Sequence, residues 1–236
     1  MRNPFRRTTS SVTAVPISVE ASADERAAHL ARVRGLVRPG FLTRDQVVAA
    51  LIDGQDEELA RSAEHLVDLV WAARAADLEG TDGGDYDRLR AAFAELERAG
   101  VLARMNFTCC QTCGTAEIAD ERTPATDARR GGYPYEQWAF TFFHEQDAER
   151  LGDVDAMLRL SFSSFVAAPD ADPADVAAGR DGDADAMRRV MEHTDATVGR
   201  LIVAALVDAG LTVTWDGTAG QRIGVAVPQW RKPLPA

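Results

Sequence analysis

The pattern of apolar positions divides the chain into a helical first part and a second part in which strands alternate with one helix. Through residues 24–100 apolar side chains recur every three or four positions, as they do along one face of a helix. This spacing predicts four helices. Their boundaries are marked by Pro39-Gly40, by Thr43 with Gln46 as a capping box, by Gly54, by Asp56, by Gly80 and by Gly100.

Beyond residue 100 the period of the apolar pattern becomes two, which is typical of strands. Alternating runs predict strands over 138–144, 158–163, 211–215 and 223–227, and a long amphipathic pattern predicts a helix over about 185–209. The first two strands are close enough to form a hairpin around Glu149 to Asp155. Residues 168–183 are rich in Asp, Ala, Pro and Gly and are expected to form a solvated loop.

This order of elements predicts an α+β protein, in which an N-terminal helical region precedes an antiparallel ββαββ unit of sheet and helix. We expect the helix of 185–209 to pack on one sheet face. That face is expected to carry Phe140, Phe142, Leu160, Val213 and Val225. Residues 1–22 are predicted to be a flexible tail, and 23–231 a single domain with its helical part at 24–100 and its ββαββ part at 135–228.

Composition and charge exclude several classes of partner. The 236 residues are 46% hydrophobic and carry a net charge of -11, so the chain can build a core while its surface repels phosphate backbones. We therefore expect no nucleic-acid partner and no membrane. The predominance of arginine over lysine is typical of GC-rich bacterial genomes. No secretory signal pattern is visible, so we expect a cytoplasmic protein whose cysteines stay reduced.

All three cysteines lie within five positions, in Cys109-Cys110-Gln111-Thr112-Cys113-Gly114. Thiols gathered this tightly are typical of a site, and Gly114 offers the backbone freedom of a ligand knuckle. Three sulfur ligands are one short of a closed structural zinc site, and a Cys-x-x-Cys pair also serves in redox chemistry. The cluster therefore admits three interpretations: simple packing, a metal site, or a redox-active or nucleophilic thiol.

A fourth metal ligand is available in Phe143-His144-Glu145-Gln146-Asp147. The candidate metal ligands, with zinc as the candidate ion, are Cys109, Cys110, Cys113, His144 and Asp147. Adjacent side chains are expected to diverge, so we expect Cys110, Cys113 and His144 to form the core of the set, with Asp147, Cys109 or water completing it. The run is not a zinc-protease motif, because Ala148 stands where the second histidine is needed.

Four motifs together resemble a bacterial family, domain of unknown function number 6891. They are Leu89-x-x-Ala92-Phe93-x-x-Leu96-x-x-Ala99-Gly100, Asn106-Phe107-Thr108-Cys109-Cys110-Gln111-Thr112-Cys113-Gly114, Phe143-His144-Glu145-Gln146-Asp147 and Ala209-Gly210-Leu211-Thr212-Val213-x-Trp215-Asp216-Gly217. The resemblance spans most of residues 25–231. It implies no activity, because the family has none assigned. Residues 132–138 form a longer run into the first predicted strand than the family has.

Two hypotheses of function follow. The absence of phosphate loops, dinucleotide fingerprints and nucleophile elbows favours a non-catalytic binding or accessory protein of the immunity type, whose partner is an unknown protein or small ligand. The alternative is a metal-binding or thiol-redox protein that uses the cysteine cluster with His144. The second hypothesis requires these side chains to converge, and the first does not.

Overall fold

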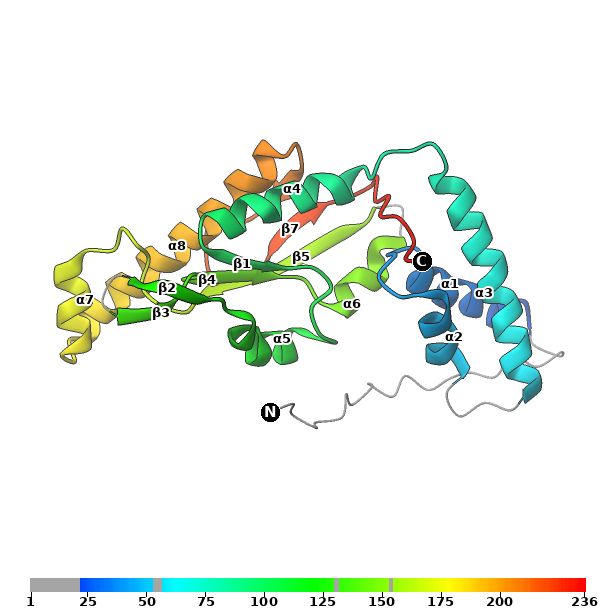
Figure 1. Cartoon of the computed structure of the whole chain (residues 1–236), viewed down its shortest axis with the longest axis horizontal. Coiled ribbons are helices and arrows are strands. Elements are labelled where there is room, and N and C mark those ends of the chain that lie inside the picture. Colours follow the sequence, from blue (N-terminus) through cyan, green and yellow to red (C-terminus); the bar gives the residue numbers. More distant parts are fainter. Residues whose placement is uncertain (1–21, 53–56, 130–131, 153–154) are drawn as a thin grey trace. The chain divides into compact units, whose positions relative to one another are not determined.

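The computed structural model describes residues 22–52, 57–129, 132–152 and 155–236 (Figure 1). These residues form two compact units, one from the described part of 1–79 with residues 233–236, and one from residues 80–232. The expectation that 23–231 folds as one domain stays a prediction, which calorimetry would test through a single unfolding transition. Along the described part of the chain, no helix is both long and apolar enough to cross a bilayer.

The first unit consists of the helices α1 (Ala23–Val37), α2 (Arg44–Ile52) and α3 (Glu57–Leu78). The predicted capping box of α2 is confirmed, because the Gln46 N–H donates to Thr43 Oγ1 at 3.3 Å and the Thr43 N–H donates to Gln46 Oε1 at 2.9 Å. The three helices bury a common core of Val33, Val37, Val47, Val48 and Val67.

The predicted tail needs one correction at its end. Ser22 is the N-cap of α1, where its hydroxyl accepts from the Glu25 N–H at 3.2 Å and its own N–H donates to the Glu25 carboxylate at 2.6 Å. The rest of the expected tail, residues 1–21, and the expected helix boundaries at Gly54 and Asp56 lie outside the described residues.

The second unit is built on a five-stranded sheet with the strand order β1-β4-β5-β7-β6. The strands are β1 (Val101–Arg104), β4 (Ala139–Phe142), β5 (Met157–Ser164), β6 (Thr212–Thr214) and β7 (Ile223–Ala226). The four predicted strands pair antiparallel, as expected, and the α+β class is confirmed. The fifth, β1, pairs with β4 in parallel and was not predicted, because four residues buried almost throughout give no alternating pattern.

The helices α4 (Asp85–Arg98) and α8 (Ala184–Asp208) cover one face of this sheet, and α5 (Gln111–Glu117) lies on the other (Figure 1). The strand register places Phe142 beside Ser161 and Thr141 beside Phe162. Phe162 packs on Trp215, which lies against Gly199 of α8. The face of α8 thus carries Thr141 and Phe162, and the opposite face carries Phe142.

The prediction that α8 packs on the sheet face of Phe140 and Phe142 is therefore wrong. It is correct for Leu160, Val213 and Val225, which lie on the same face as Phe162. Phe140 and Phe142 pack instead with Leu102 and with Ile118 of the 3-10 helix η1 (Ile118–Glu121), which follows α5. The cause is the burial of β4 on both faces, since all four of its residues are buried. On such a strand, large apolar side chains do not identify the face that meets a particular helix.

Three segments for which the apolar pattern predicts no helix or strand form regular secondary structure. The expected loop of 168–183 contains α7 (Pro173–Arg180), which is capped by Asp172 through an Ala174 N–H to Oδ1 hydrogen bond of 2.8 Å. The strands β2 (Pro124–Arg129) and β3 (Tyr133–Tyr135) form a separate antiparallel pair. Between β4 and β5 lie α6 (Glu145–Ala148) and the 3-10 helix η3 (Glu149–Gly152), so the predicted antiparallel pair is joined by helical turns.

Candidate functional site

The cysteine loop, residues 105–110, connects β1 to α5. Asn106 and Thr108 in this loop adopt positive φ angles of 51° and 58°. For the β-branched Thr108 this backbone is unfavourable, at a cost of about 1–3 kcal/mol, so the surroundings must impose it. The chain beyond β4 does so: the Phe107 N–H donates to Phe143 O at 2.9 Å, and the Glu145 N–H donates to Thr108 O at 3.0 Å. The turn that presents Cys109 is therefore held to the end of β4.

The helix α5 fixes the other two cysteines. Cys110 is its N-cap residue in an extended conformation, and the Cys110 carbonyl accepts from the Gly114 N–H at 3.0 Å. The Thr108 hydroxyl donates to the same carbonyl at 3.3 Å. Cys113 lies in the first helical turn, one residue before the buried Gly114. The Cys110 carbonyl, at the start of the Cys-x-x-Cys segment, thus accepts two hydrogen bonds.

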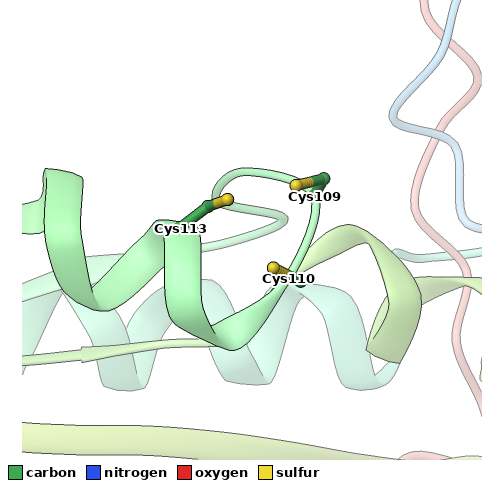
Figure 2. Close-up of side chains that lie close together, drawn as sticks. All are labelled: Cys109, Cys110 and Cys113. Carbon is green, nitrogen blue, oxygen red and sulfur yellow. The ribbon is translucent and has the colours of Figure 1, made fainter. Parts of the chain in front are cut away.

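The three sulfur atoms converge. The Sγ atoms of Cys109, Cys110 and Cys113 all lie within 4.8 Å of one another, and all three side chains are partly exposed and not in disulfides. Figure 2 shows Cys109 and Cys110 on the loop and Cys113 on the helix, with the sulfurs turned toward the space between them. The expected divergence of the adjacent Cys109 and Cys110 is wrong, because the loop curls into α5 and brings both side chains to the same side.

The neighbouring cysteines shift the pKa values of Cys110 and Cys113 in opposite directions. The pKa of Cys110 is lowered by the neighbouring Cys113, mainly by its backbone N–H and then by its thiol. The pKa of Cys113 is raised to about 12, because its thiol proton is shared with the sulfurs of Cys109 and Cys110.

His144 and Asp147 form a network of their own. His144 is the N-cap residue of α6, and its Nδ1 accepts from the Asp147 N–H at 3.3 Å while Nε2 lies 3.0 Å from the Asp147 carboxylate. The guanidinium of Arg222 binds the same carboxylate through two contacts, one of them 3.3 Å long. Both His144 and Asp147 are buried. Burial lowers the pKa of His144, Asp147 opposes this shift, and Arg222 adds to it.

The candidate metal ligands are thus divided between two clusters. Among the residues that the structure describes, no histidine nitrogen or carboxylate oxygen joins the group of three sulfurs. The sequence identified the cysteines, His144 and Asp147, and it missed Arg222. No signal could have linked Arg222 to Asp147, because the two lie 75 positions apart. The chemistry open to the cysteine cluster is therefore that of three thiols alone.

The four motifs noted in the sequence lie on α4, the cysteine loop with α5, the start of α6, and β6. A family model described as "Domain of unknown function (DUF6891)" matches residues 22–234. The chain belongs to the DUF6891 family. The resemblance seen in the sequence is confirmed. No curated protein and no solved structure matches the chain. Membership in DUF6891 assigns no activity, so function must be argued from the site.

Proposed function

We propose that this DUF6891 protein binds one thiophilic metal ion through Cys109, Cys110 and Cys113. The observation that carries the proposal is the convergence of three sulfurs within 4.8 Å of one another. An ion with metal–sulfur bonds of about 2.3 Å and tetrahedral angles separates its sulfur ligands by about 3.8 Å. Small side-chain rotations bring the thiols from the observed spacing to that distance.

Exposure of the thiols argues against simple packing. Free cysteines that serve as small apolar side chains are among the most buried residues of a protein. Here all three side chains are partly exposed, and they lie at the start of a helix on a loop with an unfavourable backbone conformation. Strained backbone that the surrounding structure enforces is common at functional sites.

A thiol-redox protein is the second candidate, and the spacing Cys110-x-x-Cys113 at the start of α5 favours it. A redox pair uses only two sulfurs and leaves the third converging sulfur unexplained. Metal binding explains all three. A non-catalytic metal-binding protein also agrees with the absence of catalytic motifs in the sequence. A partner of the immunity type and a cytoplasmic location, where thiols stay reduced, remain parts of the proposal that need their own tests.

Metal analysis of the untagged, reduced protein tests the proposal. We expect one equivalent of a thiophilic ion to be retained or taken up, and a chelator to lower the melting temperature. Each of C109S, C110S and C113S should lose the ion. Thr112→Ser is the matched control, because this exposed residue lies between the ligands in the same turn. Failure to bind zinc or copper, or unchanged binding in all three serine variants, would overturn the proposal; a Cys110–Cys113 disulfide in its place would favour the redox candidate.

A further inference from the structure

We infer that the ion is Cu(I), held by the sulfurs of Cys109, Cys110 and Cys113 without a nitrogen or oxygen ligand from the protein. This inference rests on the proposed function and adds the class of the ion. The sequence alone favours zinc, because His144 and Asp147 could complete a set of four ligands. The structure assigns these two side chains elsewhere.

Both candidates for a fourth ligand are already bound to other groups. His144 uses Nδ1 as the acceptor for the Asp147 N–H and places Nε2 at 3.0 Å from the Asp147 carboxylate. Asp147 in turn is bound by Arg222, which also donates to the carbonyl of Arg159 on β5. Turning Asp147 toward the cysteines would leave the partly buried charge of Arg222 without its carboxylate, which is strongly unfavourable. Turning His144 would break its contacts with Asp147.

The number of protein ligands then distinguishes between Zn(II) and Cu(I) as the bound ion. Structural zinc sites hold four protein ligands in a closed tetrahedron, and a three-ligand zinc site must keep a water or another external ligand. Cu(I) is a soft ion that prefers thiolates, and it needs no hard oxygen or nitrogen ligand. A cluster of three sulfurs that no described histidine or carboxylate joins matches Cu(I) better than Zn(II).

The test is an anaerobic titration of the reduced full-length protein with Cu(I) and, separately, with Zn(II), each in competition with a chromophoric chelator. We expect one equivalent of Cu(I), which an excess of Zn(II) of about tenfold does not displace. X-ray absorption of the copper-loaded protein should show sulfur neighbours only. The serine variants C109S, C110S and C113S should each weaken Cu(I) binding at least about tenfold, whereas Thr112→Ser should not.

Two further variants separate the ions. His144→Asn and Asp147→Asn should leave the Cu(I) stoichiometry unchanged, and circular dichroism checks that each variant is folded. Zn(II) that binds as tightly as Cu(I), or a nitrogen or oxygen neighbour contributed by His144 or Asp147, would overturn the inference and leave the proposed function intact. Absence of binding by either ion would overturn both.

Discussion

Gly114 of α5 lies directly against the ring of Phe142 in β4: a Cβ atom built on this glycine would come within 2.4 Å of ring atom Cε2. Phe142 is fully buried, and its ring contacts Phe107 and Phe140, with ring centroids 5.8 and 6.1 Å away. The ring therefore has no space into which to move. The sequence predicts backbone freedom as the role of Gly114, and the structure shows a close contact instead. Its role is to let the helix that carries Cys113 approach the sheet.

Gly114→Ala should therefore destabilise the protein and weaken metal binding together. Overpacking a buried contact costs about 1–3 kcal/mol, which exceeds the roughly 1 kcal/mol that alanine gains over glycine within a helix. Because α5 must shift away from Phe142, Cys113 should move relative to the other two sulfurs. Urea unfolding and metal titration of the same variant measure the two effects.

Gly220→Ala is the matched control for this substitution. A Cβ atom at Gly220 would have only the Thr218 hydroxyl oxygen nearby, at 3.8 Å, and the backbone does not require glycine. This variant should keep both its stability and its ion affinity. Equal losses in the two variants would show that the contact with Phe142 does not position α5.

Phe142→Ala removes the other side of the same contact. Truncating a fully buried phenylalanine leaves a cavity, and we expect a loss of about 3–5 kcal/mol in the free energy of unfolding. The prediction from sequence that Phe142 is a core residue is confirmed by its complete burial. A loss below about 1 kcal/mol in urea unfolding would contradict the packing described here.

Local signals in this sequence predicted local structure well. The capping box of Thr43 and Gln46 and the strand predicted over 158–163 depend on residues only a few positions apart, and both are confirmed. The alternation of burial along β5 ends at Ser161, which is buried next to Leu160. The prediction of which β4 face meets α8 is wrong, because a strand buried on both sides has no polar face that would indicate its orientation. The strand β1 was missed because its parallel pairing with β4 joins residues almost forty positions apart, with only four residues to indicate it.

The cysteine cluster shows the same limit. Its members were visible because they are adjacent in sequence, but their convergence depends on the positive φ of Thr108 and on hydrogen bonds to Phe143 and Glu145. A threonine in this conformation is unusual, so no sequence rule would have predicted it. The bond between Asp147 and Arg222 likewise joins residues that only the folded sheet brings together.

Asp147→Ala should be strongly destabilising, because it leaves the Arg222 guanidinium without its carboxylate. The Asp147 and Arg222 side chains are 11% and 26% exposed, so this pair is largely shielded from water. Removing one partner of such a pair costs on the order of 3 kcal/mol. The exposed pair of Arg188 and Glu192 on α8 is the control, since Glu192→Ala should change stability by less than about 1 kcal/mol. Similar losses from both substitutions in chemical unfolding would contradict this difference.

Burial of His144 makes stability depend on pH below neutrality. The pKa of this histidine is lowered in the folded protein, whereas in the unfolded chain it lies near 6.5, a value typical of exposed histidine. Between the two values the unfolded chain binds more protons, so stability should fall as the pH decreases from about 6.5 through the folded pKa. The slope contributed by one histidine is at most about 1.4 kcal/mol per pH unit.

His144→Asn isolates this contribution. Asparagine is a good N-cap residue that does not titrate, so the variant keeps the cap of α6 and loses the proton linkage. Unfolding free energies at several pH values, measured with a chelator present, should show a shallower acid slope in the variant than in the native chain. His29, His65 and His193 are present in both proteins, so their contributions cancel in the comparison. Identical slopes would assign the acid sensitivity to those histidines or to carboxylates.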